Sequence, residues 1–444
     1  MIVLHLAVVL AAIVLGARLG GIAIGYAGGL GVLALAALGV TPGTMPLDVV
    51  SIIMAVIAAI AAMQVAGGMA WLVDLAGRLL RRNPRHLTFL APTVTYLMTI
   101  MAGTGHTAFS TLPVITEVAK ENDLRPARPL SLAVVASQIA ITASPISAAV
   151  VFFASLLEEG GTGVDYVQLL AVAVPSTFLA VLATAAIMSA LDRVRGRTRL
   201  AADPGYRRRL AAGEVREARA PEADGPGREL RPGARRSVAI FAVGLVAVMT
   251  YATAISDKVG LVAEPVMGRD AAIIAIMLSV AALIVLTCRV PGAEVLVAST
   301  FRSGMSACVC VLGVAWLGTT FVSAHEEAIM AAAGDVLDAQ PWLLAVALVL
   351  ASALLYSQAA TARALMPTAL AIGVAAPAAV AAFPAVSALF VLPTYPTLLA
   401  AVEMDDTGTT RIGRYVFDHP FLAPGLLAIG IAVALGFGLG AVLL

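Results

Sequence analysis

Long apolar runs separated by short polar connections recur along the whole chain. A helix that spans a membrane needs about 20 mostly apolar residues. Judged by that length, the pattern predicts ten spans, at about 2–17, 20–40, 48–76, 129–157, 166–190, 236–256, 271–289, 299–322, 378–401 and 413–443. We therefore expect an all-α polytopic membrane protein with about ten spanning helices.

Two further apolar segments, at about 87–119 and 341–376, are interrupted in the middle by polar and small residues. The first interruption is Gly103-Thr104-Gly105-His106, and the second is Ser357-Gln358-Ala359-Ala360. Inside hydrocarbon, a broken helix persists only around a cavity or within protein, because unpaired backbone groups cost several kcal/mol there. Each segment therefore predicts a re-entrant hairpin, in which a half-helix enters, a polar tip turns, and a second half-helix returns.

The two halves of the chain show a faint internal repeat. Residues 103–113 align with 357–367 across the two predicted hairpins. Two prolines in each half align at nearly the same offset: Pro129 and Pro145 with Pro377 and Pro393. Inverted repeats with broken helices are typical of secondary transporters, whose binding site lies where the breaks meet.

The repeat also predicts the division of the chain. Five spans in each half give two similar halves opposite orientations in the membrane. We therefore expect a first inverted repeat over 1–190, a linker over 191–235 and a second inverted repeat over 236–444.

Composition agrees with a location in lipid. The chain is 60% hydrophobic and 12% charged, with a mean hydropathy of +0.97. Soluble domains carry about 25% charged residues, which cover their water-facing surface. A chain of 444 residues with about half that share excludes a soluble multi-domain enzyme and a disordered protein. The 39 glycines and 23 prolines predict further breaks within the apolar segments.

The net charge of +1 conceals a strong asymmetry between the two sides of the predicted membrane. All but three of the 28 Lys and Arg residues fall on the side of the 191–235 linker. The exceptions are Lys258 and Arg269 on the opposite side and Arg363 within the second hairpin. Because basic residues favour the cytoplasm, we expect a cytoplasmic linker and two periplasmic termini. The linker is either solvated or a regulatory or lipid-binding arm.

Four breaks carry the candidate chemistry: the two hairpin tips, and the spans at 142–147 and 392–397. Ser144 followed by Pro145 predicts a helix start inside the membrane, with a side-chain cap and a proline at the first helical position, and Thr394 with Pro396 is similar. Free N–H groups at such starts favour an anion, and hydroxyls add donors without a buried charge. The candidate site residues are Thr104, Gly105, His106, Thr107, Ser144, Pro145, Ser357, Gln358, Thr361, Arg363, Pro393 and Thr394. The simpler interpretation of each break alone is a kinked helix.

Two of these candidates have alternative roles. Arg363 either binds a carboxylate bidentately or extends to the outer interface, because its second hairpin opens outward. His106 serves as a proton carrier, as a donor to the substrate, or as a partner for the broken backbone.

Other function classes are disfavoured by what the sequence lacks. A cation or proton antiporter of the same architecture would need carboxylates within the spans, and no such pair is present. An intramembrane hydrolase would need a complete set of catalytic groups, but Ser110 and His106 have no third partner at a suitable spacing. We expect no metal site, no nucleic-acid partner and no cofactor, although a coupling proton or sodium ion stays open. A channel also stays open, because only its flux would distinguish it.

Several motifs resemble the Dcu family of anaerobic C4-dicarboxylate transporters, over nearly the whole chain except the central linker. They are Gly16-Ala17-Arg18-Leu19-Gly20-Gly21, Leu79-Leu80-Arg81-Arg82-Asn83-Pro84 with Gly103-Thr104-Gly105-His106 beyond it, Phe301-Arg302-Ser303-Gly304-Met305, Tyr356-Ser357-Gln358-Ala359-Ala360-Thr361-Ala362, Leu392-Pro393-Thr394-Tyr395-Pro396-Thr397 and Met404-Asp405-Asp406-Thr407-Gly408-Thr409-Thr410-Arg411-Ile412-Gly413.

The resemblance implies a transporter of fumarate, succinate, malate and aspartate in the bacterial inner membrane, working by exchange or uptake. It implies the fold of the ion-transporter superfamily, with inverted repeats, paired re-entrant hairpins, an elevator-like moving domain and a homodimer. The second hairpin resembles the DcuA branch, in which the place of Arg363 looks like a lysine. The resemblance supplies no ligand residues, and it leaves the preferred dicarboxylate and the coupling ion open.

Overall fold

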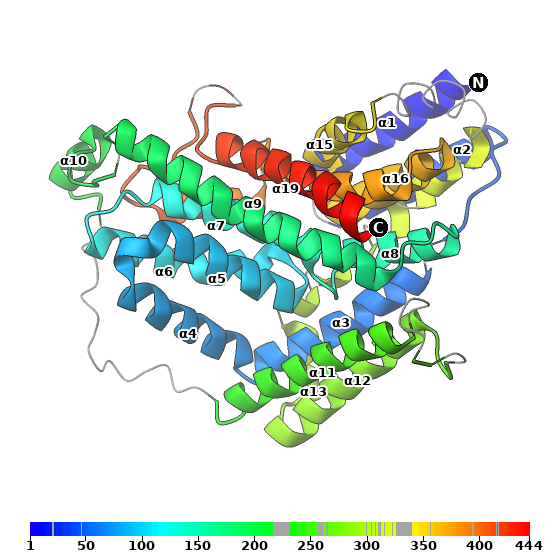
Figure 1. Cartoon of the computed structure of the whole chain (residues 1–444), viewed down its shortest axis with the longest axis horizontal. Helices are drawn as coiled ribbons and strands as arrows, with labels where there is room; N and C mark the ends of the chain where they lie inside the picture. Colours follow the sequence, from blue (N-terminus) through cyan, green and yellow to red (C-terminus); the bar gives the residue numbers. More distant parts are fainter. Residues whose placement is uncertain are drawn as a thin grey trace.

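The apolar runs form helices. The computed structural model describes residues 1–444 except 20, 21, 46, 197, 216–230, 256–260, 263, 264, 299, 303, 307, 310, 311, 315, 322, 326–339, 356, 393, 394, 414 and 416. The described residues form α-helices and short 3-10 segments and contain no named strand (Figure 1), which agrees with the predicted all-α class.

The first half and the linker contain ten α-helices and three 3-10 segments within the described residues. They are α1 (Ile2–Leu19), α2 (Ala23–Ala37), α3 (Leu47–Val65), α4 (Gly68–Arg82), η1 (Pro84–His86), α5 (Leu87–Ala102), η2 (Gly105–Thr107), α6 (Ala108–Glu121), α7 (Ala127–Ile139), η3 (Ala140–Ala143), α8 (Ala148–Glu159), α9 (Tyr166–Val194) and α10 (Pro204–Ala211).

The second half is also helical within the described residues. It contains α11 (Ala234–Ala254), α12 (Arg269–Cys288), α13 (Gly292–Val297), α15 (Leu343–Leu355), α16 (Gln358–Ala371), α17 (Ala376–Ala382), η4 (Phe383–Phe390), α18 (Pro396–Met404) and α19 (Leu422–Leu443). The described residues between 300 and 325 are also helical.

Five of the described helical segments are long and apolar enough to cross a membrane. They are Ala127–Glu159 taken as one segment, α9, α11, α12 and α19. The bent pair of α3 and α4 would be a sixth if it forms one span. The number of ten membrane crossings remains a prediction.

The prediction of a continuous span over 48–76 is wrong. α3 ends at Val65, and α4 continues at 69° to it. Gly67 between them has φ of 88°, a left-handed conformation that favours glycine. α4 is also amphipathic rather than apolar, since it exposes an ion pair between Asp74 and Arg78 at 3.1 Å.

The last span is shorter than the predicted 413–443. α19 begins only at Leu422, after a polar loop that ends in His419 and Pro420. Proline has no backbone N–H and so stands at or before a helix start.

The helices are interrupted at all four predicted places. α5 and α6 are joined through Gly103 and η2, and α15 and α16 through residues 356 and 357. η3 and residues 144–147 separate α7 from α8. η4 and residues 391–395 separate α17 from α18. Whether the first two pairs are re-entrant in a membrane stays a prediction, as do the inverted orientation of the halves and the span count.

The two halves use matching contacts. α5 packs against α7 in the first half, and α15 packs against η4 in the second. Across the halves, α8 of the first half packs against α16 of the second, and α18 of the second half packs against α6 of the first. In both contacts, a helix that follows a break packs against the second helix of the other half's hairpin. α9 and α19, the last helices of the two halves, lie side by side (Figure 1).

The buried apolar residues form separate clusters. The largest lies mainly among α5–α9 and α15–α19, so the hairpins and the broken helices share one core. A second cluster lies mainly among α3, α11 and α12. A small third cluster joins α1 and α2 to Leu317.

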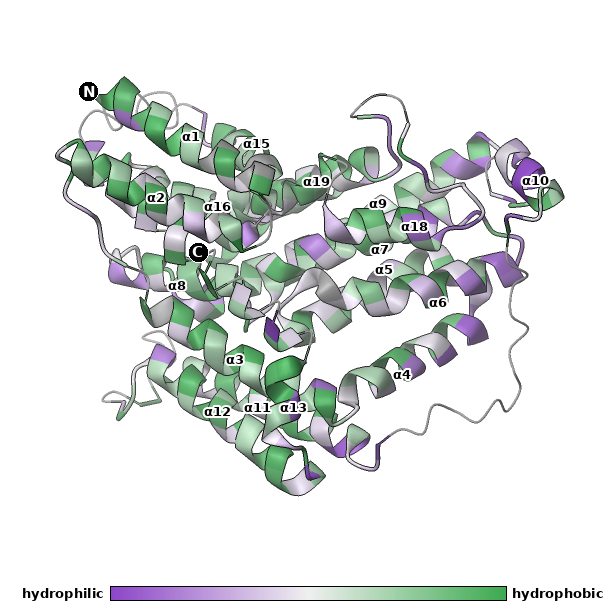
Figure 2. Cartoon of the chain, turned by 180° about the vertical axis from the view of Figure 1, so that it is seen from behind, coloured by the Kyte–Doolittle hydropathy of each residue, from purple (hydrophilic) through white to green (hydrophobic). Residues whose placement is uncertain are grey.

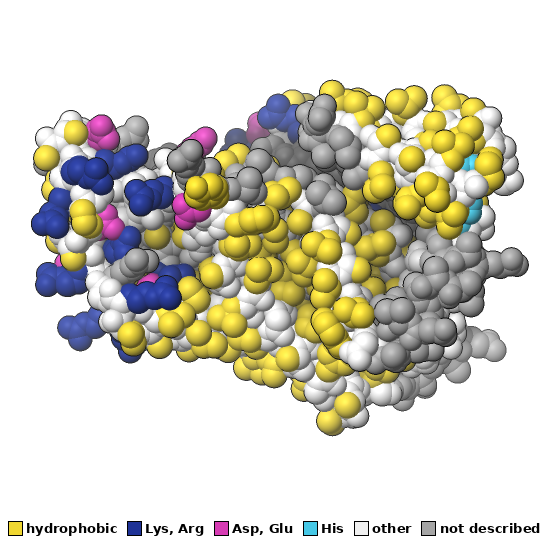
Figure 3. All heavy atoms as spheres, turned by 90° about the horizontal axis from the view of Figure 1, so that it is seen from above, with side chains coloured by type: hydrophobic (Ala, Val, Ile, Leu, Met, Phe, Trp, Pro, Cys, Tyr) yellow, Lys and Arg dark blue, Asp and Glu magenta, His cyan; other side chains and the backbone are white. Residues whose placement is uncertain are grey.

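Charge is segregated along the long axis of the molecule. Hydropathic colouring shows hydrophilic residues concentrated around α10 and the end of α4, with apolar residues over most other helices (Figure 2). In the space-filling view, Lys and Arg gather at the end where α10 lies, while apolar side chains dominate the rest of that face (Figure 3). We call this the basic end.

Candidate substrate cavity

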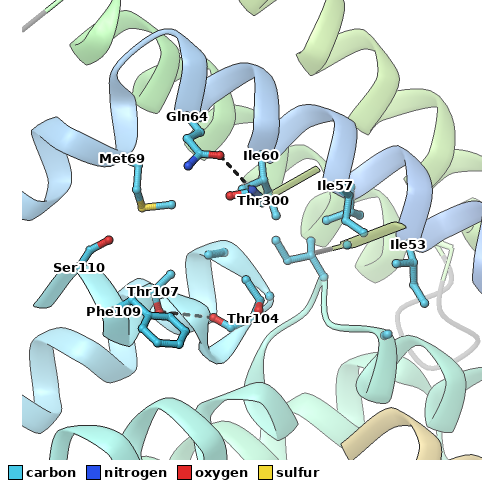
Figure 4. A pocket seen from close by; sticks show the side chains of 16 residues that line it. Ile53, Ile57, Ile60, Gln64, Met69, Thr104, Thr107, Phe109, Ser110 and Thr300 are labelled. Carbon is cyan, nitrogen blue, oxygen red and sulfur yellow. Dashed lines mark hydrogen bonds between the residues drawn. The ribbon is translucent and has the colours of Figure 1, made fainter. Parts of the chain in front are cut away.

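A cavity of about 430 Å³ lies between α3 and the tip of the α5–α6 hairpin (Figure 4). Its volume is within the usual range for small-molecule sites. The described lining residues are Ile53, Val56, Ile57, Ile60, Gln64, Met69, Ala102, Gly103, Thr104, Thr107, Phe109, Ser110, Ile146, Ala148, Thr300 and Gly304. Figure 4 places the labelled isoleucines of α3 on one side and the labelled hairpin residues on the other.

The hairpin tip is folded by a glycine turn and by threonine contacts. Gly103 ends α5 with φ of 64°, and a Cβ atom there would lie 3.1 Å from Cγ1 of Ile146. Both the conformation and the close approach therefore require glycine. The hydroxyls of Thr99 and Thr107 lie 2.9 Å apart, and Thr107 also contacts the carbonyl of Thr104 at 3.4 Å.

The break before α8 lies against this tip. Ser144 donates a hydrogen bond to the carbonyl of Ile100 at 2.7 Å. Ser147, not Ser144, caps α8, because its Oγ accepts a hydrogen bond from the N–H of Val150 at 3.2 Å. The predicted helix start at Ser144-Pro145 is therefore wrong by three residues. The carbonyl of Pro145 instead accepts a hydrogen bond from the hydroxyl of Tyr166.

The N-terminal ends of two half-helices reach the cavity. α8 begins with the lining residue Ala148, and α6 follows directly on the lining residue Thr107. The partial positive charge of a helix N-terminus favours an anion. Among the described lining residues none is charged, so the favourable groups are these helix ends, hydroxyls and the Gln64 amide. The N–H of Thr300 donates to Gln64 Oε1 at 3.2 Å and fixes that amide.

The second tip lies against the first half of the chain through Gln138. Ser357 caps α16 by accepting a hydrogen bond from the N–H of Ala360 at 3.2 Å. Nε2 of Gln358 then donates to Oε1 of Gln138 at 3.1 Å. Nε2 of Gln138 in turn donates to the hydroxyl of Thr397, at the start of α18, at 3.2 Å.

The first tip also meets Gln138. A Cβ atom at Gly105 would lie 2.9 Å from Gln138 Nε2, so the tip backbone lies directly on this fully buried amide. All four breaks therefore converge on the end of α7. Neither Gln138 nor Thr397 is among the predicted site residues. The available signal was a single amide inside the apolar run of α7, one turn before the predicted break.

Arg363 lies on α16, away from the cavity lining. Its side chain is only 1% exposed, and its guanidinium carbon lies 5.1 Å from the ring centroid of Phe152 on α8. A cation over an aromatic ring at this distance is stabilised by the ring quadrupole. The alternative in which Arg363 extends to the outer interface does not occur in this conformation.

The structure gathers only some of the predicted residues at the cavity. Thr104 and Thr107 line it, Gly105 and Pro145 are adjacent in sequence to lining residues, and Ser144 is two positions before the lining residue Ile146. The second-half residues lie outside the lining, on or beside α16: Ser357, Gln358, Thr361 and Arg363. The side chain of His106 and residues Pro393 and Thr394 lie outside the described part of the chain. Within that part, no group of three His, Cys, Asp or Glu residues could hold a metal ion.

Comparison with known proteins gives a consistent picture over the full length. Residues 1–444 match the family described as anaerobic C4-dicarboxylate membrane transporter. The chain is 59% identical to the C4-dicarboxylate transporter DcuA of Wolinella succinogenes and 58% identical to that of Escherichia coli K12, in each case over 100% of both chains. It is 36% identical to the anaerobic C4-dicarboxylate transporter DcuB of Escherichia coli O6:H1, over 98% of this chain and 97% of that protein.

Proposed function

Because the chain belongs to the anaerobic C4-dicarboxylate membrane transporter family, with its higher identities to DcuA members, we propose that it carries fumarate, succinate, malate or aspartate across the bacterial inner membrane. The chain is a membrane transporter and not an enzyme. The proposed substrates are supported above all by one observation: two half-helix starts and several hydroxyls meet at an uncharged cavity.

A C4-dicarboxylate suits this cavity chemically. One carboxylate would lie at the starts of α6 and α8, where backbone N–H groups and the positive helix ends favour an anion. The hydroxyls of Thr104 and Ser110 and the amide of Gln64 are neutral donors within the lining. The isoleucines of α3 would contact the short carbon chain between the carboxylates. In this proposal Arg363 on α16 adds positive charge to the site without lining the cavity. Its guanidinium lies against Phe152 of α8, the helix whose start reaches the cavity.

Transport would proceed by an elevator-type movement. The hairpins and broken helices share the largest buried cluster, whereas α3, α11 and α12 form a second one. The cavity lies where these two groups of helices meet. A movement of the first group along the second would expose the cavity to each side in turn, and the hydrogen bonds of Gln138 would hold the second tip and the start of α18 to α7 during it.

The arrangement in the membrane follows from charge and repeat. We place the basic end and the 191–235 linker in the cytoplasm and both termini in the periplasm. The two halves, 1–190 and 236–444, are then inverted repeats, each with one re-entrant hairpin. We expect a homodimer, as the superfamily resemblance implies, and coupling by exchange, by cation symport or by both.

Counterflow into proteoliposomes tests this function. Vesicles that contain purified protein and unlabelled succinate should accumulate labelled fumarate or aspartate from outside. Vesicles that contain the protein but no internal succinate should accumulate much less. Butyrate, which has one carboxylate, should not replace succinate. Continuous flux that needs no counter-substrate would indicate a channel. Proton or sodium flux without any dicarboxylate would favour the alternative, an ion or proton antiporter of the same architecture.

Coupling requires separate gradients. Uptake into empty vesicles is measured with an inward sodium gradient, with an inward proton gradient and with neither. Stimulation by one gradient assigns the coupling ion, while uptake that needs internal dicarboxylate under all three conditions assigns obligatory exchange.

A further inference from the structure

Two adjoining cavities lie at the basic end and share no described lining residue with the first cavity. Their volumes are about 390 and 700 Å³, and they share Arg125, Thr409 and Arg411. The smaller one is completed by described linker residues between Gly196 and Arg208, and the larger one by Ile412, Gly413, Asp418, His419 and Pro420 before α19. We call the pair the basic cavity. The proposed transport does not use it.

One wall of the basic cavity is a loop folded around a buried carboxylate. Asp405 is 2% exposed and accepts hydrogen bonds from the Thr409 hydroxyl at 2.9 Å and from the Thr410 N–H at 2.6 Å. The N–H of Thr407 donates to the same carboxylate at 3.1 Å. These bonds fix the turn that presents Thr409 and Arg411 to the cavity.

The opposite wall is the first part of the linker, which is folded rather than merely solvated. Arg199 pairs with Asp123 at 2.8 Å, and the N–H of Ala201 donates to the same carboxylate at 2.7 Å. The Ala201 N–H and Arg199 hold the pKa of Asp123 below its usual range, so the carboxylate stays ionised and the contact persists. Asp203 caps α10 and pairs with Arg125 at 2.6 Å.

Positive charge exceeds negative charge in this cavity. The described lining holds five arginines and three aspartates: Arg125, Arg128, Arg199, Arg208, Arg411, Asp192, Asp203 and Asp418. Asp192 is engaged by both arms of Arg128, at 2.7 and 2.9 Å. Within the described residues, Arg208 and Arg411 form no ion pair. Two guanidinium groups are therefore available to an anion.

Buried polar atoms without partners gather at the same place. Nε of Arg125, which lines both volumes, is buried and has no hydrogen-bond partner among the described residues. The hydroxyl of Thr410, beside the lining residues Thr409 and Arg411, is also buried without a hydrogen-bond partner among the described residues. Buried donors are normally satisfied by a partner within the protein or by a ligand, water or ion.

We propose that the basic cavity binds a phosphoryl group, with Arg411 and Arg208 as its charged ligands and Arg125 Nε as a buried donor. Guanidinium groups match the geometry of phosphate oxygens, and Arg208 and Arg411 form no ion pair among the described residues that would compete with an anion. Each of the two volumes has room for more than inorganic phosphate alone. The phosphoryl group would come either from a soluble phosphorylated molecule or from an anionic lipid headgroup.

Calorimetric titration of the purified full chain in neutral detergent tests this site with inorganic phosphate and with AMP. A parallel thermal-unfolding assay adds phosphatidylglycerol, with phosphatidylcholine as the reference lipid. At least one phosphoryl probe should bind saturably. Arg411→Gln should weaken that binding by about tenfold or more, the factor that corresponds to about 1.4 kcal/mol. Arg85→Gln, at an exposed arginine outside the cavity, should leave it unchanged.

The outcomes separate the two sources. Binding of phosphate or AMP in detergent assigns a soluble ligand, and stabilisation by phosphatidylglycerol alone assigns a lipid headgroup. Arg208→Gln, on the exposed surface of α10, gives a second variant if Arg411→Gln does not fold. Any of three results would overturn the proposal. They are no binding of any probe, equal binding by both cavity variants and the wild type, and displacement of the bound phosphoryl probe by saturating succinate. Failure of transport alone would leave it intact.

Discussion

Nε2 of Gln358 donates a hydrogen bond to Oε1 of Gln138 at 3.1 Å, and so joins the start of α16 to the end of α7. The two residues belong to different halves and are 220 positions apart in the chain. Both are buried, and Gln138 extends the link to Thr397 on α18. A single amide thus connects the second hairpin and the second broken helix to the first half.

Gln138→Leu should impair both folding stability and transport. The substitution removes the Gln138 side-chain acceptor of the buried Gln358 amide, which keeps only its bond to the Gln138 backbone carbonyl at 3.3 Å, and it removes the amide donor that bonds to the buried Thr397 hydroxyl. A buried polar group that loses its partner costs about 1–3 kcal/mol. We expect a lower thermal-unfolding midpoint and at least about tenfold slower counterflow in proteoliposomes. Gln340→Leu, at an exposed amide, is the matched control and should behave as the wild type.

The double variant Gln138→Leu/Gln358→Leu isolates the link itself. Removal of both partners leaves fewer unpaired groups than the sum of the single changes, so the combined loss of stability should be smaller than that sum. Strictly additive losses would show that the two amides act independently.

Thr104→Val tests the hydroxyl at the first hairpin tip. The two side chains are similar in shape, but valine cannot donate a hydrogen bond to a carboxylate. We expect the KM for succinate in counterflow to rise by about tenfold, because a hydrogen bond to a charged group contributes roughly 1.5–3 kcal/mol. Thr93→Val on α5, the helix that leads into this tip, is the control, since its hydroxyl bonds to the Phe89 carbonyl at 2.7 Å. Equal KM values in both variants would remove Thr104 from the site.

The four interruptions could be predicted because their signal is local. Glycine, proline, serine and threonine clusters within long apolar runs weaken a helix wherever they occur. The same local information could not choose between Ser144 and Ser147 as the cap of α8. That choice depends on the Ile100 carbonyl of another helix, which accepts the hydrogen bond of Ser144.

The non-local parts of the site could not be predicted in this way. Gln138 is an ordinary polar residue of α7 until Gln358 and Thr397, 220 and 259 positions later, are placed beside it. Gln64 and Thr300 similarly meet across 236 positions to form one wall of the cavity. The bend after α3 was not predicted, although Gly67 and Gly68 give the same kind of local signal within the apolar run 48–76.

Arg363 should contribute charge rather than shape. Arg363→Ala should raise the KM for succinate strongly, with a smaller change in the maximal rate per folded protein. Arg363→Lys keeps the charge and should retain most of the affinity. A merely structural arginine would lower the unfolding midpoint without this difference in KM. Phe152→Leu removes the ring beneath the guanidinium and should have a modest effect, since such contacts contribute about 0.5–2 kcal/mol.

Glu158→Gln should change the balance between the two orientations of the cavity. Arg269 on α12 pairs with Glu158 on α8 at 2.7 Å and also bonds to the Ser155 hydroxyl at 2.5 Å. If α8 moves against α12 as proposed, these contacts hold one orientation and must break in the other. Glu159→Gln is the control, because this neighbouring carboxylate is exposed and forms no ion pair among the described residues.

The balance can be measured at a cysteine in the cavity. Ser110→Cys is introduced after Cys288, Cys308 and Cys310 are replaced by serine, and a membrane-impermeant maleimide is applied from outside intact cells. Since the Arg269 contacts no longer hold one orientation, Glu158→Gln should change the labelling rate severalfold, while Glu159→Gln should not. The exchanged pair Glu158→Arg with Arg269→Glu restores the attraction and should return the rate toward that of the unaltered background. The four proteins compared are the unaltered background, Glu158→Gln, Glu159→Gln and the exchanged pair. Identical labelling in all four would mean that α8 and α12 keep one arrangement, and would contradict an elevator-type movement between them.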